Sequence, residues 1–342
     1  MTKRTAGRAA GVAVGLLCLG WSLRDVDAAE AAHAVVRAGP LLLLGLLPYG
    51  LSLAADGWGF SRLLRRVGCR IHPIGLAGTR ASAEALAISL PGGALIAESV
   101  KPFLLRSRFG VPLEEGAGGM AARKCLIVAG HGAYIGLAVA LGWGWLATQS
   151  QRLTGAAGLP WLVLGSGVGI GAVAVAMRFA FGSGTLVSRL SGLAGRIPFA
   201  ALRSRLESAK RSFDRADAGL RRMLELRSGA ASLPAFVIMW MCEALESWLL
   251  LRLFGAELGF VETLALEATI SAVRAFAFFA PAGIGFQDAG YLALLGTGGP
   301  GASVAAAFVL AKRLRELVWI GIGYALLAVD RRGPAHHESW SA

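Results

Sequence analysis

Apolar runs long enough to cross a lipid bilayer recur along the whole chain. Inside hydrocarbon every backbone N–H and C=O group must be hydrogen-bonded within the protein, so such runs form spanning helices or a closed barrel. The runs are continuous and lack the alternation of a membrane β-barrel. Only 16% of the 342 residues are charged, against about 25% in a soluble protein. We therefore predict an all-α polytopic membrane protein, with apolar segments near 9–23, 39–59, 81–97, 117–147, 159–182, 232–255, 261–280, 283–296 and 302–328.

Lys and Arg are concentrated in particular connections between these segments. Residues 60–80 carry five and residues 185–230 carry ten, whereas residues 256–260 carry none. Cytoplasmic loops of membrane proteins are enriched in Lys and Arg, so the basic connections are predicted to face the cytoplasm, together with both chain ends. The expected location is the bacterial inner membrane, as a multi-pass protein.

Two segments do not fit simple alternation across the membrane. The connections on both sides of 81–97 are basic, so this segment is predicted to enter and leave on the cytoplasmic side, and "SLPGGAL" at its centre suits a helix break. If the connections at 256–260 and 298–301 are both external, then 261–296 also turns back, at "APAGIG". The other six segments are predicted to span conventionally.

The two re-entrant segments are similar to each other. Each reads Pro-x-Gly, then an acid five residues after the Gly, then Arg 25 residues after the acid. Because the copies open to opposite sides, we interpret them as an inverted-topology repeat whose interrupted helices point to a transport site. A chance match between ordinary proline kinks is the alternative. A shift of 190 positions aligns Pro91 with Pro281, Gly93 with Gly283, Glu98 with Asp288 and Arg123 with Arg313.

The predicted organisation is a single membrane domain over 1–342. It contains a first pseudo-repeat region at 60–182 and a second at 232–328. A basic, amphipathic, cytoplasmic connection at 185–230 joins them.

Ionisable residues lie deep inside the apolar segments. A Lys, Arg or Asp at a helix centre costs about 2.5–3.5 kcal/mol, so such groups are kept only when they are paired, face water or have a function. The deep residues are Glu84, Arg123, Lys124, His131, Glu243, Glu246, Glu267, Arg274, Asp288, Lys312, Arg313, Arg315 and Glu316.

Two arginines are the leading candidates for binding a substrate. We expect Arg123 and Arg313 to approach one cavity from opposite halves and to bind an anionic head group, since arginine binds phosphate bidentately. Glu98 and Asp288 would position the arginines or release the head group. The alternative is purely structural: ion pairs of Glu98 with Arg123, and of Asp288 with Arg313, would lock the repeats together.

The remaining deep charges also allow two interpretations. Glu84 and Arg274 occupy matching repeat positions with opposite sign, and an ion pair between them would be structural. Glu243 and Glu246 lie one helical turn apart, a spacing that suits carriage of protons or of a cation. His131 relays a proton or has a hydrogen-bonded packing role.

The sequence contains no sign of an enzyme. No nucleophile–base pair, metal-ligand cluster or phosphate-cradling loop is recognisable, so neither catalysis nor a cofactor or metal site is expected. The four scattered cysteines are interpreted as small apolar residues. The net charge of +13 is distributed as topology demands, so nucleic acid is not an expected partner.

The basic connection contains a predicted helix over 197–227. Apolar residues recur at three- and four-residue steps from Phe199 to Met223, and Pro198 suits its first turn. Such a helix lies on anionic lipid, packs against the bundle, or binds a cytoplasmic partner such as a lipid-biosynthetic enzyme.

Three stretches together resemble a known family. "LPGGALIAESVKPFLLRSRFGVPLEEGAGGMAARKCL", "APAGIGFQDAGYLALLG" and "AAAFVLAKRLRELVW" are similar to the transmembrane region of lysylphosphatidylglycerol synthases. The details "GFQDAGY" and "KRLRE" most resemble the hopanoid-associated HpnL-type membrane proteins. In the synthases this region is a lipid flippase joined to a soluble aminoacyl-transferase domain. The chain stops twelve residues after Asp330, so synthase activity is not expected.

The resemblance implies roles at matching positions only. Relatives often have Arg where this chain has Lys101, and Glu where it has Asp288; both departures keep the charge. The family motifs fall on Pro91, Gly93, Glu98 and Lys101, on Gly285, Gln287, Asp288 and Ala289, and on Lys312, Arg313 and Arg315.

The expected function is therefore lipid flipping or lipid handling, with an anionic or amphiphilic phospholipid or hopanoid-related lipid as substrate. The predicted substrate-binding residues are Arg123, Arg313, Glu98, Asp288, Lys101 and Lys312. The predicted helix breaks are Pro91, Gly93, Pro281 and Gly283. The first alternative is a non-transporting scaffold that recruits a lipid-biosynthetic enzyme through 197–227. The second is a small-solute transporter.

Overall fold

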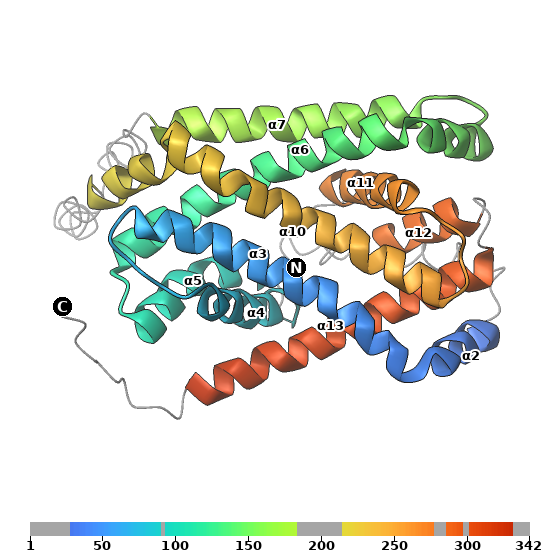
Figure 1. Cartoon of the computed structure of the whole chain (residues 1–342), viewed down its shortest axis with the longest axis horizontal. Helices are drawn as coiled ribbons and strands as arrows, with labels where there is room; N and C mark the ends of the chain where they lie inside the picture. Colours follow the sequence, from blue (N-terminus) through green and yellow to red (C-terminus); the bar gives the residue numbers. More distant parts are fainter. Residues whose placement is uncertain (1–27, 90–92, 183–213, 277–284, 297–300, 331–342) are drawn as a thin grey trace, which may run out of the picture.

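The computed structural model describes residues 28–89, 93–182, 214–276, 285–296 and 301–330 (Figure 1). Regular structure in these ranges is helical, and they contain no strand, which confirms the all-α fold class. The predicted first apolar segment, 9–23, lies outside the described residues.

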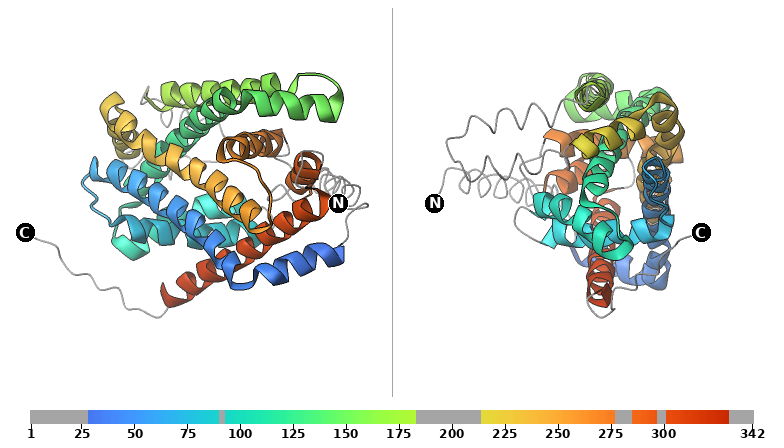
Figure 2. Two further views of the ribbon diagram at one scale, coloured as in Figure 1. Left: turned by 45° about the vertical axis from the view of Figure 1, so that its right-hand side comes forward. Right: turned by 90° about the vertical axis from the view of Figure 1, so that its left-hand side faces the viewer.

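Long helices form the body of the molecule and run roughly along its long axis (Figure 1). They are α3 (Leu46–Arg65), α6 (Leu113–Thr154), α7 (Leu159–Gly182), α10 (Leu226–Leu253) and α13 (Ala302–Asp330). Two further elements, α2 (Ala28–Ala38) and the 3-10 helix η1 (Gly39–Gly45), lead into α3. Figure 2 shows α7 packed along the outer side of α6.

Local sequence explains where the longest helix begins and ends. Pro112 precedes α6 in an extended conformation, and the acidic Glu114 and Glu115 occupy the first turn, where they complement the positive end of the helix dipole. At the other end Gly155 adopts φ +71°, a left-handed conformation that glycine adopts without steric cost.

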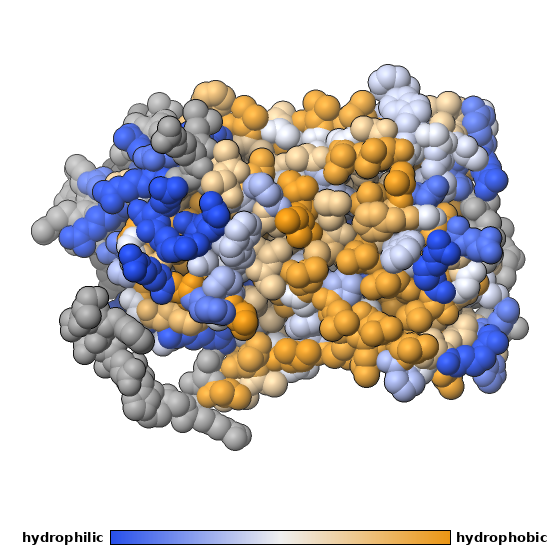
Figure 3. Space-filling view, in the orientation of Figure 1, coloured by the Kyte–Doolittle hydropathy of each residue, from blue (hydrophilic) through white to orange (hydrophobic). Residues whose placement is uncertain are grey.

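Four described helical segments are long and apolar enough to cross a membrane: Ala29–Arg65, Leu113–Thr154, Leu159–Phe181 and Gly229–Leu253. Apolar side chains cover the middle of the face in Figure 3, and polar ones gather at its two ends. On α7 the side chains of Trp161, Leu162 and Phe179 are exposed, as expected of a surface that faces lipid. The chain is a membrane protein.

The predicted spanning segment at 302–328 falls on α13, which is not one of these four. At 29 residues α13 is long enough to span. Its middle, however, carries Lys312, Arg313, Arg315 and Glu316. These charged residues lower the mean hydropathy of α13, and they form part of the site described below.

Two pairs of shorter helices occupy opposite halves of the molecule. The helices α4 (Pro73–Ser89) and α5 (Gly93–Phe109) pack against each other, as do α11 (Phe260–Phe276) and α12 (Phe286–Gly296). In Figure 1 the first pair lies towards the end where α3 stops and α6 starts, and the second lies towards the opposite end. Of the predicted breaks, Gly93 is the first residue of α5, and Pro91, Pro281 and Gly283 lie outside the described residues.

The described end of the basic connection packs into the bundle. Residues 214–224 are helical, and Leu220, Met223 and Leu224 are buried in a cluster with side chains of α3, α5, α6 and α10. Arg221 and Arg222 on the same helix are exposed. The amphipathic stretch was expected to lie on lipid, to pack against the bundle or to bind a partner, and residues 214–224 pack against the bundle. Residues 197–213 lie outside the described chain.

A glycine permits the close contact between α4 and α13. A Cβ on Gly323 would lie 2.5 Å from the carbonyl oxygen of Ala81 and 2.7 Å from the Cβ of Ala85. Because one of these atoms is backbone, the helices would have to separate. We expect Gly323→Ala to lower the free energy of unfolding by about 1–3 kcal/mol, the usual cost of overpacking.

The matched control for this prediction is two residues away. Gly321 is exposed on the same helix, and a Cβ there would meet nothing within 4 Å. Denaturation of both variants in detergent checks the prediction. Equal stability of Gly323→Ala and Gly321→Ala would show that the α4–α13 contact does not depend on Gly323.

Candidate functional site

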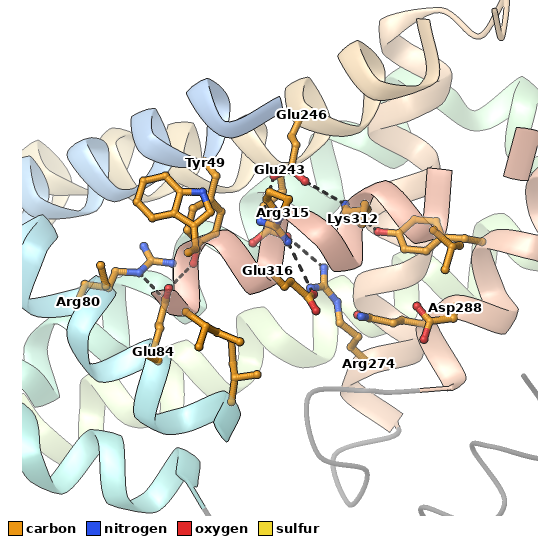
Figure 4. Close-up of a pocket in the computed structure, with 18 residues that line it drawn as sticks. Tyr49, Arg80, Glu84, Glu243, Glu246, Arg274, Asp288, Lys312, Arg315 and Glu316 are labelled. Atoms are coloured by element: carbon orange, nitrogen blue, oxygen red, sulfur yellow. Dashed lines mark hydrogen bonds and ion pairs between the residues drawn. The ribbon is translucent and has the colours of Figure 1, made fainter. Parts of the chain in front are cut away.

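A cavity of about 270 Å³ lies between six helices in the interior of the bundle (Figure 4). Side chains from α3, α4, α10, α11, α12 and α13 point into it. Its polar lining consists of Tyr49, Arg80, Glu84, Glu243, Glu246, Arg274, Gln287, Asp288, Tyr291, Lys312, Arg315, Glu316 and Trp319.

The spacing of residues on α13 brings its polar side chains to the cavity. Arg315 and Glu316 follow Lys312 by three and four positions, and Trp319 follows them by four and three, so all four lie on one face of the helix. This face meets carboxylates from three other helices, α10, α11 and α12, described in turn below.

Lys312 forms the centre of the first cluster. Its Nζ lies 2.9 Å from Glu267 Oε1 and donates to Ser247 Oγ at 2.8 Å and to Tyr291 OH at 3.1 Å. Glu267 Oε1 also accepts from the hydroxyls of Ser247 and of Tyr291, the latter at 2.7 Å. The Glu267 side chain is 1% exposed, and three donors converge on one of its oxygens. Its other oxygen, Oε2, is buried, has no hydrogen-bond partner among the described residues, and lies 3.9 Å from Arg274 NH2.

Arg315 forms the second cluster, which links α13 to α10 and α3. Its NH1 donates to Glu246 Oε2 at 3.1 Å, and its guanidinium lies 4.6 Å from the centre of the Tyr49 ring. The hydroxyl of Tyr49 donates to Glu84, whose other oxygen accepts from Arg80 Nε at 2.7 Å. Charged and aromatic groups thus continue from α13 across to α4.

Arg313 forms the third cluster. Its NH2 lies 2.7 Å from both carboxylate oxygens of Asp288, and its NH1 lies 2.6 Å from Glu316 Oε2. Asp288 also accepts the backbone N–H of Gly285 at 3.1 Å, close to the start of α12. Gly285 has φ +85°, a conformation that favours glycine. The predicted Asp288–Arg313 ion pair is present.

Three polar atoms on residues that line this cavity are buried and have no hydrogen-bond partner among the described residues. They are the donors Nε of Arg315 and Nε1 of Trp319, and the acceptor Oε1 of Glu246. An unpaired buried donor or acceptor costs about 1–3 kcal/mol, and such groups in folded proteins require an explanation. A bound polar group that accepts from the two donors would explain their position.

The charges of the cavity are nearly balanced. Four basic side chains and five carboxylates line it, so it carries one negative charge in excess when all are ionised. Arg313 and Glu267, which contact the lining residues, add one charge of each sign. The cavity is therefore not the strongly positive pocket that an anion-binding site on its own would present.

The first half of the predicted site lies apart from this cavity. Arg123 is buried and makes a bidentate pair with Asp56, at 2.9 and 2.8 Å. It lines a small, separate pocket with Lys101 and Arg80. Among the described residues that line these two pockets, only Arg80 lines both. The expectation that Arg123 and Arg313 approach one cavity is corrected, because neither lines it: Asp56 holds Arg123 at the separate pocket, and Arg313 only contacts lining residues.

Two predicted ion pairs are replaced by others. Glu98 lies 2.9 Å from Lys101 and 3.7 Å from Lys124, and Arg123 takes Asp56 as its partner. Glu84 pairs with Arg80, as described above, and Arg274 pairs with Glu243 at 3.1 Å. The role of each of these residues in binding substrate stays a prediction.

Sequence reasoning missed five residues of the site: Tyr49, Asp56, Arg80, Tyr291 and Trp319. Asp56 had a recognisable signal, since it is an acid inside the apolar segment 39–59. Arg80 was counted with the basic connection 60–80, but α4 begins at Pro73, which places Arg80 two turns into a helix. Tyr49 and Trp319 gave no signal, because aromatic residues are common in spanning segments.

His131 stacks on Trp240 of α10, with ring centres 3.8 Å apart. It does not line the cavity, and its Nε2 has no hydrogen-bond partner among the described residues. Of the two roles considered for it, this geometry fits packing.

A family model described as the lysylphosphatidylglycerol synthase TM region matches residues 8–323, most of the chain. Comparison with curated proteins finds no match.

Proposed function

The chain belongs to the lysylphosphatidylglycerol synthase TM region family, and we propose that it is a lipid flippase whose cavity carries a charged lipid head group across the inner membrane. The proposed activity is transport of a lipid, not its synthesis. The resemblance to hopanoid-associated proteins extends the proposed substrates from phospholipids to hopanoid-related lipids.

The observation that carries this proposal is the set of buried, unpaired polar atoms on residues that line the cavity. Arg315 and Trp319 each present an unused N–H donor, and both line a polar space inside an apolar bundle. A phosphate oxygen accepts from both kinds of donor, and arginine favours phosphate because its fork of N–H groups matches the anion. The volume of about 270 Å³ lies just below the range of sites for drug-sized ligands. It suits a head group whose tails stay in the bilayer.

The helix boundaries support the proposed inverted repeat. The shift of 190 positions that aligns the two motifs brings the start of α6 within one residue of the start of α13. It also brings the starts of α4 and α5 within three residues of those of α11 and α12. In transporters built this way, substrate sites lie at the interface between the repeats. The cavity has residues of α4 on one side and of α11, α12 and α13 on the other.

The proposal gives the two halves different tasks. The residues that act at or beside the cavity are Arg315, Lys312, Arg313 and Asp288. Arg123, Glu98 and Lys101 act from the first half, where Asp56 lies 3.6 Å from Arg80 and so connects Arg123 with the cavity.

Lipid movement in proteoliposomes tests the function. We expect liposomes that contain the purified chain to expose fluorescent NBD-phosphatidylglycerol of the inner leaflet to external dithionite faster than protein-free liposomes do. The same assay with a fluorescent hopanoid tests the second substrate class. Traces identical to those of protein-free liposomes for both lipids would contradict the flippase proposal.

A further inference from the structure

Glu246 is the least compensated of the fully buried carboxylates around the cavity. Its side chain is 1% exposed and lies on α10 with one oxygen 3.1 Å from Arg315. The other oxygen, Oε1, has no hydrogen-bond partner among the described residues, and its nearest cation is Lys312 Nζ at 4.0 Å. A buried carboxylate with an unfilled oxygen is costly in its ionised form.

The other carboxylates in this region accept more hydrogen bonds, although Glu267 Oε2 is also buried without a partner among the described residues. Asp56 has two hydrogen bonds from Arg123, and Asp288 has two from Arg313. Glu267 accepts from three side chains, and Glu84 accepts from Arg80 and Tyr49. Only Glu246 among these five combines full burial, a single hydrogen bond and a place in the cavity lining.

We propose that Glu246 is a proton-binding site and that a proton bound there travels with the lipid head group. The proposal rests on the proposed flippase function and adds the coupling ion to it. The proton comes from water on one side of the membrane and forms an O–H bond to Oε1. No electron is transferred, and the same bond breaks when the proton leaves on the other side.

Protonation of Glu246 has two consequences for the cavity. It removes the excess negative charge, so an anionic head group no longer enters a net-negative space. It also neutralises the partner of Arg315, whose NH1 is then free to donate to the head group. One proton and one anionic head group therefore enter together, and their combined charge is zero.

The surroundings of Glu246 provide charges of both signs. Elements packed around α10 are α3, η1, α6, α11 and α13, and η1 contains no titratable residue. The groups presented to this region of α10 are Arg315 and Lys312 of α13, Glu267 and Arg274 of α11, Tyr49 of α3, His131 of α6, and Glu243 on α10 itself. The two cations nearest to Glu246 both have a second carboxylate partner, Glu316 for Arg315 and Glu267 for Lys312. Loss of charge at Glu246 thus leaves neither cation isolated.

The decisive experiment imposes a pH difference across proteoliposomes that contain NBD-phosphatidylglycerol. For one proton per lipid, a difference of one pH unit should drive up to about tenfold enrichment of the label in the leaflet on the alkaline side. Pyranine trapped inside should report proton movement in step with the label. Lipid movement by the wild type without enrichment and without a pyranine response would overturn the coupling and leave the flippase function standing. No lipid movement at all would overturn both.

Variants assign the coupling to one carboxylate. Glu246→Gln should still move NBD-phosphatidylglycerol but should abolish its pH-driven enrichment, whereas Glu257→Gln, in an exposed connection outside the cavity, should behave as the wild type. Enrichment by Glu246→Gln equal to that of the wild type would overturn the assignment. If Glu246→Gln does not fold, Glu246→Asp keeps a titratable group at a different depth. Its rate should then reach half of its maximum at a different pH, and a pH profile identical to that of the wild type would overturn the assignment.

Discussion

The Asp56→Asn variant should lose about 3–5 kcal/mol of stability, the usual cost of breaking a buried ion pair by removing one partner. The side chains of Asp56 and Arg123 are 2% and 5% exposed, and two hydrogen bonds of 2.8 and 2.9 Å join them. Asparagine retains the shape but cannot neutralise Arg123, which then stays buried as an uncompensated cation. Arg80, 3.6 Å from the same carboxylate, still has Glu84. Chemical denaturation of the purified protein in detergent measures the loss.

A double variant separates the buried charge from the packing. Replacing both partners with apolar residues of similar size, Asp56→Leu with Arg123→Met, removes the unpaired charge and should recover most of the lost stability. If Asp56→Asn unfolds within about 0.5 kcal/mol of the wild type, a change typical of an exposed surface site, then water or another group solvates Arg123. The pair would then not hold α3 to α6.

The Arg315→Lys variant should slow lipid movement about 10- to 100-fold and leave stability nearly unchanged. Lysine retains the charge that pairs with Glu246, but it lacks the Nε donor and the planar fork that binds phosphate bidentately. A hydrogen bond to a charged group contributes about 1.5–3 kcal/mol, and each 1.4 kcal/mol is a factor of ten. The rate of dithionite access to NBD-phosphatidylglycerol in proteoliposomes checks the prediction.

The control for this variant is Arg37→Lys, since Arg37 is exposed on α2 and lies outside the cavity. Its rate should match the wild type. An Arg315→Lys protein that moves lipid at the wild-type rate would show that Arg315 acts only as the counter-charge of Glu246. The donor that carries the proposed function would then be unnecessary.

The sequence predicted the helical class, most helix positions and the ion pair of Asp288 with Arg313. A long apolar segment in lipid forms a helix because its backbone groups must be hydrogen-bonded within the segment, whatever its tertiary contacts. The helices α6, α7 and α10 therefore lie close to the predicted segments. Asp288 and Arg313 were predicted as partners because they stand out as charges within apolar surroundings and recur in a repeat. Their ion pair is present at 2.7 Å.

The partners in the first half could not be predicted in the same way. The repeat suggested Glu98 as the partner of Arg123. The partner in the structure is Asp56, which lies on α3. Because α3 lies outside the two repeated stretches, the repeat could not predict this pair. The pairs Glu246–Arg315 and Glu267–Lys312 join residues that are 69 and 45 positions apart in the chain. Their geometry depends on how α10, α11 and α13 cross, and no local pattern encodes it.

The order of charged helices along the chain has a consequence for how the protein is made. Each Lys or Arg on α13 would cost about 2.5–3.5 kcal/mol at the centre of a helix that enters the membrane alone. Their carboxylate partners Glu246, Glu267 and Asp288 lie on α10, α11 and α12, which all precede α13. Because a chain is synthesised from its N-terminus, these carboxylates have left the ribosome before α13 does. Helix α13 therefore meets its counter-charges as it inserts.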